Sequence, residues 1–199
     1  MENSFEKREM PIECEEVAKD NLDLAIKIQR VIFPEEDGAL NLRASVDESL
    51  IEKVYGEGAR EKVTFWLCKD KEGDAVGITG IYVYFEYPDD AWLAWYGILP
   101  EKRGQGYGSK LLLWTMKKAK ELGYKNLRLY TDLEDNGAAV ELYRKMGMIE
   151  ESYEAEDMGE EKTIIFSKSL VSDKSEKLGN KMLFLKKQAE IQMRGKELD

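Results

Sequence analysis

Histidine is absent from this chain of 199 residues. A serine or cysteine nucleophile activated by histidine is therefore excluded, and so are the usual zinc sites that use imidazole ligands. Acid–base chemistry in this protein falls to carboxylates, tyrosine, lysine or water. We predict no metal cofactor.

Cysteine is scarce, and long apolar runs are missing. The two cysteines, Cys14 and Cys68, stand far apart in the sequence, and we expect both to be small buried side chains of a reduced protein without a disulfide. No segment approaches the roughly 18 uncharged apolar residues of a transmembrane helix. The N-terminal segment, MENSFEKREM, is charged and lacks the apolar run of a secretory signal. The sequence therefore predicts a cytoplasmic protein with no membrane partner.

Basic residues are outnumbered by acidic ones. Lys and Arg total 30 against 40 Asp and Glu, which gives a net charge of -10. Binding of a phosphate backbone requires a basic field, so no nucleic-acid partner is expected. A cationic substrate would be attracted instead. The hydrophobic share of 43% suffices for a core, and the length favours one main domain.

The central feature of the sequence is the stretch 92–113, WLAWYGILPEKRGQGYGSKLLL. Its aromatic and aliphatic first part predicts a strand, 92–99, buried on both faces and ended by Pro100. The glycine-rich turn RGQGYG follows, and then a helix closed by Gly123. The apolar positions of this helix are Leu111, Leu112, Met116, Ala119 and Leu122. Such an arrangement favours an anion site, because glycines let backbone N–H groups approach the ligand and a helix N-terminus is partly positive.

The remaining segments predict strands and helices in the overall order β-α-α-β-β-β-α-β-α-β-β. Strands are expected at 10–17, 63–68, 75–87, 92–99, 126–131, 148–153 and 162–170. Besides the helix after the glycine turn, helices are expected at 21–33, with Leu24, Ile28 and Ile32 facing inward, at 47–56 and at 137–146. Residues 1–9 predict a disordered leader. Residues 171–199 predict a tail with an amphipathic helix over about 180–194.

Two motifs resemble those of one enzyme family. The glycine spacing fits neither the Walker A loop nor the dinucleotide fingerprint. The pattern R-x-x-G-x-G at 103–108, after a strand ending in I-x-P at 98–100, resembles the acetyl-CoA loop of the GNAT family of N-acetyltransferases. The segment 136–148, NGAAVELYRKMGM, resembles the family's N-x-x-A-x-x-x-Y-x-x-x-G-F motif, with Met148 in place of Phe. The resemblance covers residues 10–170 and implies a GNAT-type acyl-CoA N-acyltransferase fold, an α/β fold with a mixed central sheet flanked by helices, here with a C-terminal helical extension.

For the site, this resemblance implies an acetyl-CoA cosubstrate whose pyrophosphate is held by loop amides. Tyr143 would be the catalytic acid that protonates the departing thiolate. A backbone N–H near 95–97 would bind the oxyanion if the strand bulges there, as it does in family members. The residues implied to bind acetyl-CoA are Tyr96, Gly97, Ile98, Arg103, Gly104, Gln105, Gly106, Tyr107, Gly108, Ser109 and Asn136.

The base that deprotonates the amine is not given by these motifs. Lysine-modifying members of the family carry a strand glutamate in this role, and counting back from Ile98 that position is Trp92 here. We expect either Glu86, at the end of the neighbouring strand, or a relay of ordered water to act instead.

The acceptor site is expected among aromatic and acidic residues. Phe33–Glu36, Tyr82, Tyr84 and Trp92 would form a pocket suited to an alkylammonium group, unless these aromatic side chains belong to the core. Three functions follow: an N-acetyltransferase of a small cationic amine or metabolite, an acetyltransferase of a protein N-terminus or lysine, and a CoA-binding regulatory module without turnover. The intact Tyr143 disfavours the third. The tail helix would pack on the domain body or build a homodimer.

Overall fold

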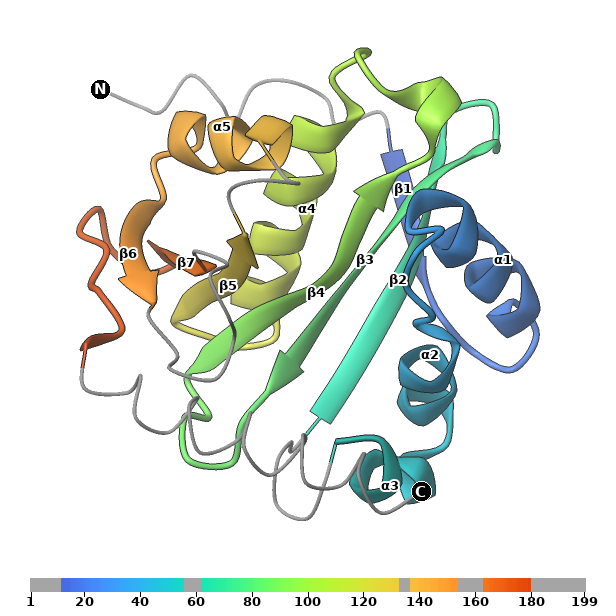
Figure 1. Cartoon of the computed structure of the whole chain (residues 1–199), viewed down its shortest axis with the longest axis horizontal. Helices are drawn as coiled ribbons and strands as arrows, with labels where there is room; N and C mark the ends of the chain where they lie inside the picture. Colours follow the sequence, from blue (N-terminus) through green and yellow to red (C-terminus); the bar gives the residue numbers. More distant parts are fainter. Residues whose placement is uncertain (1–11, 56–61, 133–136, 154–162, 180–199) are drawn as a thin grey trace.

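The structure, a computed structural model, describes residues 12–55, 62–132, 137–153 and 163–179. One seven-stranded sheet runs through them in the order β1-β2-β3-β4-β5-β7-β6 (Figure 1). The strands are β1 (Ile12–Glu16), β2 (Lys62–Asp70), β3 (Ala75–Val83), β4 (Asp90–Ile98), β5 (Asn126–Asp132), β6 (Ile149–Tyr153) and β7 (Thr163–Ser169). The helices are α1 (Leu22–Ile32), α2 (Ala39–Val46), α3 (Ile51–Tyr55), α4 (Tyr107–Glu121) and α5 (Gly137–Lys145), with short 3-10 helices η1 (Glu48–Leu50) and η2 (Pro100–Lys102).

The sheet is mixed. β4 and β5 run parallel, and the other neighbouring pairs are antiparallel. A parallel pair cannot be closed by a hairpin, and here the connection passes through α4. Helices α1–α3 pack on one face of the sheet, and α4 and α5 pack on the other. The predicted mixed sheet flanked by helices is confirmed.

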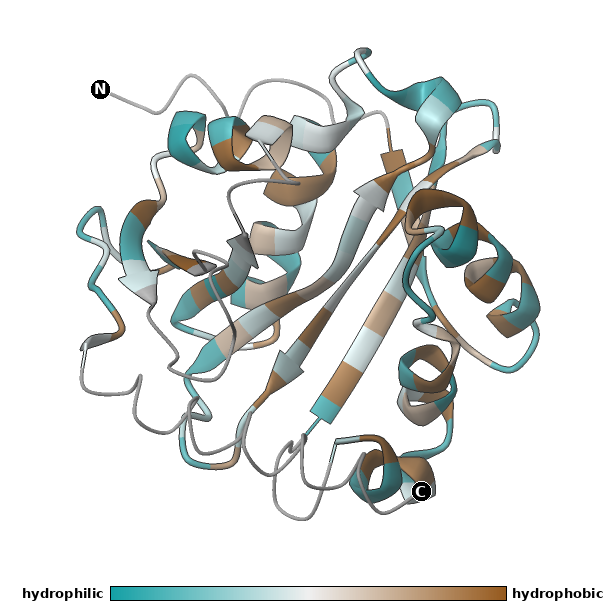
Figure 2. Ribbon diagram, in the orientation of Figure 1, coloured by the Kyte–Doolittle hydropathy of each residue, from teal (hydrophilic) through white to brown (hydrophobic). Residues whose placement is uncertain are grey.

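Each face of the sheet buries its own apolar cluster. On one face, Ile78 of β3 packs with Ile28 of α1 and Leu42 of α2. On the other, Leu127 of β5 packs with Leu111 of α4. Because both faces are covered, the central strands are apolar on both sides, whereas each helix needs only one apolar side. Figure 2 shows the consequence on α1–α3, which carry both brown and teal residues.

Two details of the predicted helices are wrong. The prediction omits α2, ALNLRASV, because this helix is short and its small and polar residues form no clear apolar stripe. Leu24, predicted to face inward, is 43% exposed, since the buried side of α1 begins at Ala25. Leu122, the last apolar position listed for the helix after the glycine turn, is the C-cap of α4 and is 44% exposed.

The expectation of two unbonded cysteines is also wrong. Cys14 and Cys68 form a disulfide with a Cα–Cα distance of 4.1 Å. Cys14 of β1 stands directly opposite Cys68 of β2 in the antiparallel register. Their distance along the sequence is misleading because strand register, which depends on the folded sheet, brings them face to face. The argument for a reducing compartment, which rested on unbonded cysteines, therefore loses its support.

Several predictions concern residues outside the described ranges. These are the leader 1–9, Asn136 and the tail helix at 180–194. Within the described ranges, no helix has the length and apolar character needed to cross a membrane.

The chain continues to build the domain after residue 170, where the predicted domain ends. Leu178 is 4% exposed and belongs to the apolar cluster beneath α1–α3. The Glu176 carbonyl accepts a 3.1 Å hydrogen bond from Arg128 Nη1 of β5. Leu178 therefore adds one side chain to the core, while most of residues 171–179 are exposed.

Candidate active site

β4 and β5 pair at one end only. The parallel register joins Asp90–Trp92 to Asn126–Arg128, and β5 continues alongside β7 as far as Asp132. From Leu93 onward β4 has no β5 residue opposite it, although both strands are described, and the two strands diverge (Figure 1). The prediction that 92–99 is buried on both faces is thus wrong for Leu93–Gly97. These residues are partly exposed because the wedge opens their β5 side.

A buried ion pair holds the closed end of this wedge. Asp90 Oδ2 accepts a 2.9 Å hydrogen bond from Arg128 Nε, and the two side chains are only 1% and 3% exposed. Asn126 Nδ2 donates to the other Asp90 oxygen at 2.8 Å, and Arg128 Nη1 donates to Ser167 Oγ at 2.7 Å. Buried charges are tolerated when they are paired and hydrogen-bonded. This network joins β4, β5 and β7 at the point where the wedge begins.

β4 bulges at the open end of the wedge. Two of its residues, Trp95 and Tyr96, stand opposite the single residue Thr79 of β3. Trp95 has a φ of +42° and is the only non-glycine residue with positive φ in the described part of the chain. Such a backbone costs a bulky residue roughly 1–3 kcal/mol, and it is found mainly at functional sites. Trp95 packs on the α1 side, with its ring centroid 5.2 Å from that of Phe33.

The end of α1 and the loop after it close over the bulge on that side. A Cβ atom at Gly97 would collide with Ile32 and Phe33, so only glycine allows α1 to lie directly on β4 here. A Cβ atom at Gly38 would lie 2.8 Å from both Gln29 Nε2 and Trp95 Cε2. The loop 33–38 and the side chain of Gln29 therefore line the α1 side of the bulge.

Two tyrosines, the buried Tyr143 and the partly exposed Tyr96, lie on the opposite face of the bulge. The rings of Tyr96 and Tyr143 have centroids 6.3 Å apart, and Tyr143 also lies 5.3 Å from Phe166. Burial raises the pKa of both hydroxyls well above the ordinary value of 10.0. Both are therefore neutral and protonated at physiological pH. The Tyr96 hydroxyl donates a 2.7 Å hydrogen bond to the carbonyl of Gly108, in the first turn of α4.

The glycine-rich turn presents backbone N–H groups at the start of α4. Gly104 and Gly106 have φ of +74° and +82°, and a Cβ atom at either would meet no atom within 4 Å. Lys110 N–H donates to the Gly106 carbonyl at 3.3 Å, which closes the first turn of α4, so the N–H groups ahead of it have no partner within the helix. Open space, free amides and a helix N-terminus together suit an anionic group.

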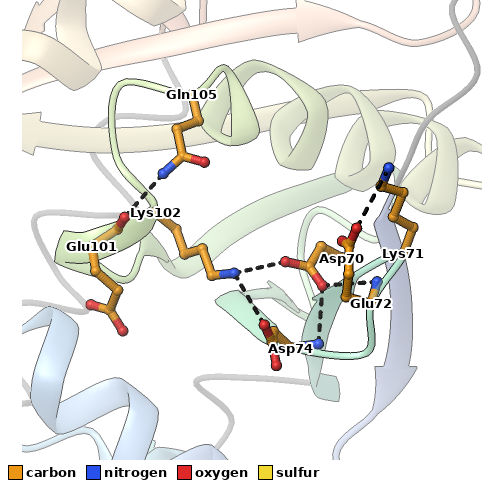
Figure 3. A network of polar contacts seen from close by, with 7 residues as sticks. All are labelled: Asp70, Lys71, Glu72, Asp74, Glu101, Lys102 and Gln105. Atoms are coloured by element: carbon orange, nitrogen blue, oxygen red, sulfur yellow. Dashed lines mark hydrogen bonds and ion pairs between the residues drawn. The ribbon is translucent and has the colours of Figure 1, made fainter.

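Polar contacts fix the start of this turn, and Figure 3 shows those of Lys102 and Gln105. Arg103 Nε donates to the Ile98 carbonyl at 3.0 Å, and Gln105 Nε2 donates to the Glu101 carbonyl at 3.0 Å. Figure 3 shows Lys102 reaching across to the β2–β3 turn, where its Nζ lies 2.7 Å from Asp70 Oδ2 and 3.6 Å from Asp74. The turn is thereby tied to a neighbouring hairpin.

Asp70 is the anchor of this contact. Its residue is 5% exposed, and its other oxygen accepts backbone N–H groups of Glu72 at 3.1 Å and Asp74 at 3.0 Å. The hydrogen bond from Lys102 is the largest cause of a lowered pKa of Asp70, and the same bond raises the pKa of Lys102. The charged pair is thus favoured in the folded state.

This pair predicts a pH window of stability. The lowered pKa of Asp70 adds stability that is complete above its ordinary value of 3.8 and is lost as pH falls through the folded pKa. The raised pKa of Lys102 adds stability that is complete below 10.5 and is lost as pH rises through its folded pKa.

We therefore expect Asp70→Asn to lower the melting temperature most between these limits, and the difference in melting temperature from the unmodified protein to shrink outside them. Asp74→Asn is the control, because the Asp74 side chain is 73% exposed and 3.6 Å from Lys102. An equal gap at every pH would contradict the role of the ion pair.

The structure brings most of the predicted site residues together. Tyr96, Gly97 and Ile98 lie on the open part of β4, and the turn 103–109 follows directly and is bonded to Tyr96. Tyr143 of α5 lies beside Tyr96. Among the described residues, no group of three or more acidic or cysteine side chains is placed to hold a metal ion.

Glu86 and Trp92, the two residues predicted to contact the substrate, do not lie at the bulge. Glu86 is exposed in the turn between β3, which ends at Val83, and β4, which begins at Asp90. This turn leads into the first residues of β4, whereas the bulge lies farther along the strand. The structure therefore does not bring Glu86 to the bulge. Trp92 is 1% exposed and packs with Tyr82 and Tyr84, at ring-centroid distances of 6.3 and 5.8 Å. These three aromatic residues belong to the core cluster.

Other features of the site have no signal in the sequence. The positive φ of Trp95, the contact of Lys102 with Asp70 and the position of Gln29 beside the bulge each depend on segments distant in the chain. For the loop 33–38, the sequence indicates only that it is a turn at the surface, because it contains proline and acidic residues.

The wedge, the bulge, the glycine-rich turn and the buried Tyr143 lie together in the structure, and comparison with known proteins shows which family has this arrangement. The model of the acetyltransferase (GNAT) family matches residues 25–148. The chain belongs to the GNAT family. The predicted family and fold are confirmed, and the predicted enzyme class, acetyl-CoA-dependent N-acetyltransferase, is that of the family. No curated protein matches the chain.

Solved structures of GNAT proteins share this fold. A GNAT-family acetyltransferase from Desulfovibrio desulfuricans has a TM-score of 0.63 at 17% identity, covering 80% of this chain and 99% of its own. The spermidine N-acetyltransferase of Vibrio cholerae, solved with CoA and spermine, has a TM-score of 0.60 at 16% identity, covering 81% and 97%. A ribosomal-protein-alanine N-acetyltransferase from Escherichia coli has a TM-score of 0.60 at 18% identity, covering 82% and 96%. At these identities the likeness concerns the fold alone.

Proposed function

We propose that this GNAT protein transfers the acetyl group of acetyl-CoA to the primary amine of a small cationic molecule, with Tyr143 as general acid. The observation that carries the proposal is the buried, protonated Tyr143 hydroxyl on the face of the β4 bulge that also holds the glycine-rich turn 103–109. The net charge of -10 favours a cationic acceptor over an anionic one.

The turn and the wedge would hold the cosubstrate. Backbone N–H groups of 104–109 would bind its pyrophosphate, because they lie at the N-terminus of α4 without helical partners, whereas the Arg103 N–H already donates to the Pro100 carbonyl at 3.3 Å. Tyr96, Gly97 and Ile98 would line its pantetheine arm in the opening between β4 and β5. Asn136 enters the proposal through its motif alone.

The chemistry requires stabilisation of an oxyanion and two proton movements. The amine nitrogen forms a bond to the acetyl carbon while the carbon–sulfur bond breaks. An N–H of the bulge near Trp95–Gly97 would stabilise the charge on the carbonyl oxygen. Tyr143 would give its proton to the departing sulfur, and the proton lost by the amine would return through water to Tyr143. A water relay fits this site better than Glu86, which lies at the other end of β4.

Tyr143 is a better acid than Tyr96 in this arrangement. Both hydroxyls are protonated, but the Tyr96 hydroxyl already donates a 2.7 Å hydrogen bond to the Gly108 carbonyl. Tyr96 instead ties the bulge to the first turn of α4. The departing sulfur would therefore receive its proton from Tyr143.

Release of CoA thiol over a panel of amines tests this function. We expect thiol release from acetyl-CoA with one or more small primary amines and none with the matched tertiary amines, which cannot form a stable amide. Acetyl-CoA should raise the melting temperature of the protein in the same buffer. Acetyl-CoA binding without thiol release from any amine or peptide would favour the regulatory module.

Self-association belongs to the proposal as well. A solved spermidine N-acetyltransferase of Vibrio cholerae is described as dodecameric, and most soluble oligomers are symmetric assemblies of one chain. We propose a homodimer as the simplest such assembly for this protein.

A further inference from the structure

The junction of β4 and β5 is held differently on the two faces of the sheet. On one face, α4 packs against both strands and bridges them. On the other face, α1 packs mainly against β3 and β4, and α2 packs mainly against β2 (Figure 1). On this second face the junction therefore depends chiefly on polar side chains and on the segment that follows β7.

Arg128 of β5 points to this second face. Its neighbours Leu127 and Leu129 belong to the cluster packed against α4, and side chains alternate between the two faces along a strand. Arg128 stands opposite Trp92 in the last residue pair that joins β5 to β4. It is therefore the last β5 residue held against β4 before the wedge opens.

The guanidinium of Arg128 bonds to three other parts of the chain. Its Nε donates to Asp90 Oδ2 of β4 at 2.9 Å. Its Nη1 donates to Ser167 Oγ of β7 at 2.7 Å and to the Glu176 carbonyl, beyond β7, at 3.1 Å. The planar fork of a guanidinium suits this task, because its N–H groups point in several fixed directions. One side chain thus couples β4, β5, β7 and the residues after β7.

The Glu176 carbonyl belongs to the C-terminal segment 171–179, which is fixed on both sides of this contact. Ahead of it, Ser175 Oγ accepts the N–H of the last β7 residue at 3.0 Å. Beyond it, Leu178 is 4% exposed in the apolar cluster of the α1 face. Glu151 Oε2 of β6 accepts the N–H of Leu178 at 2.9 Å and that of the next residue at 3.3 Å. The segment therefore presents a positioned carbonyl to Arg128, although most of its side chains are exposed.

These contacts lie where they can set the opening of the wedge. β5 pairs with β7 over 126–132, but it pairs with β4 over 126–128 alone. A small shift of β5 and β7 together would therefore change the opening without breaking the bonds between these two strands. An opening that is already set binds its ligand without a further ordering cost.

We propose that Arg128 is a positioning residue for acetyl-CoA and that the C-terminal segment 171–179 acts through it. Arg128 fixes β5 against β4 at the closed end of the wedge, and the Glu176 carbonyl fixes the guanidinium. Both act on the shape of the opening that receives the pantetheine arm, and neither acts on the reacting atoms. This inference rests on the proposed acetyl transfer and names residues on which cosubstrate affinity depends.

Steady-state kinetics of Arg128→Lys in the full chain test the first part. Lysine keeps a positive charge for Asp90, but its single nitrogen cannot reproduce the fork. We expect KM for acetyl-CoA to rise about tenfold, the effect of one lost hydrogen bond to a charged group. Both kcat at saturating acetyl-CoA and KM for the amine should stay unchanged. A purely structural role would instead reduce the folded fraction, which lowers kcat and leaves KM in place.

Arg144→Lys is the matched control. Arg144 Nε donates to Glu150 Oε2 at 2.8 Å, much as Arg128 Nε donates to Asp90, but the Arg144 side chain is 42% exposed. The same substitution at this surface pair should leave KM for acetyl-CoA unchanged.

Leu178→Ala tests whether the segment acts through Arg128, and it covers the case in which Arg128→Lys does not fold. A smaller side chain loosens the seat of the segment, so KM for acetyl-CoA should rise about two- to tenfold, the range of one neutral hydrogen bond. In the double variant, KM should be no higher than in Arg128→Lys alone, because residues that share one contact are not additive. An unchanged KM in Leu178→Ala, or a double variant in which the two effects multiply, would overturn the role of the segment.

Calorimetric titration with acetyl-CoA gives the same comparison without an amine. The dissociation constant should rise in Arg128→Lys as KM does. An unchanged constant, or a fall of kcat at unchanged KM, would overturn the role of Arg128 and leave the proposed function standing. Acetyl-CoA binding without turnover of any amine would contradict the proposed function and leave the comparison of dissociation constants valid. An unmodified protein that does not bind acetyl-CoA would overturn both.

Discussion

Tyr143→Phe is expected to lower kcat about 10²- to 10⁴-fold, the usual contribution of a general acid. The substitution removes one hydroxyl and keeps the ring that packs between Tyr96 and Phe166. Fold and acetyl-CoA affinity should therefore change little. Because burial raises the pKa of Tyr143 above 10.0, the unmodified protein should show no loss of rate from its deprotonation below that pH. Thiol release under single-turnover conditions measures the effect on the chemical step.

Tyr96→Phe is the matched control for this experiment. It removes the hydroxyl of the other ring of the pair, which already donates a hydrogen bond to the Gly108 carbonyl. We expect it to weaken acetyl-CoA binding more than it slows the chemical step, because Tyr96 ties β4 to the first turn of α4. A Tyr143→Phe protein within threefold of the unmodified rate would mean that solvent protonates the thiolate. A larger loss of rate in Tyr96→Phe than in Tyr143→Phe would assign the general acid to Tyr96 instead of Tyr143.

Gly106→Val is expected to abolish the stabilisation of the protein by acetyl-CoA. At a cosubstrate concentration a hundredfold above the dissociation constant, this stabilisation should be about 2.7 kcal/mol in the unmodified protein. Gly106 has a φ of +82°, which a β-branched residue rarely adopts, and its missing Cβ leaves open space beside the free amides. Valine would distort the turn and fill that space. Thermal unfolding with and without acetyl-CoA measures the loss.

Gly123→Val separates this effect from ordinary backbone strain. Gly123 lies just beyond the other end of α4 and has a φ of +96°, and a Cβ atom there would likewise meet no atom within 4 Å. Valine at this position should destabilise the unliganded protein to a similar degree, roughly 1–3 kcal/mol. The shift caused by acetyl-CoA should survive in Gly123→Val and vanish in Gly106→Val. An undiminished shift in Gly106→Val would remove the turn from the binding site.

The glycine-rich turn 103–109 combines conformationally free glycines with fixed ends. Glycine at 104 and 106 allows the left-handed backbone, but it also leaves the unfolded turn with many conformations to lose. Contacts of Arg103 with the Ile98 carbonyl and of Lys102 with Asp70 restrict both the strand end and the turn. Amides that are already in place would bind an anion without a further ordering cost, so in the proposed function these contacts would favour cosubstrate affinity.

The local pattern of the sequence determined the order of most elements and the two motifs. Apolar spacing located β4, α4 and α5, because the residues that specify a strand or helix are its own neighbours. Glycines in the turn 103–109 marked a backbone that other residues avoid, and this property is also local. The sequence predicted less well which side of each helix is buried. Leu24 and Leu122 fit a helical period, yet both are exposed, because packing partners and helix ends decide which side is covered.

Only the tertiary structure decided how distant residues meet. The register of β1 against β2 places Cys14 opposite Cys68, and no local pattern specifies a register between strands so far apart in the chain. The wedge opens where pairing of β4 with β5 stops, beside the buried pair of Asp90 and Arg128. The positive φ of Trp95 exists because the bulge is held between two packed faces of the sheet. Sequence periodicity reports which residues are apolar, whereas the site depends on where strands stop pairing, and that is settled by the packing of the whole chain.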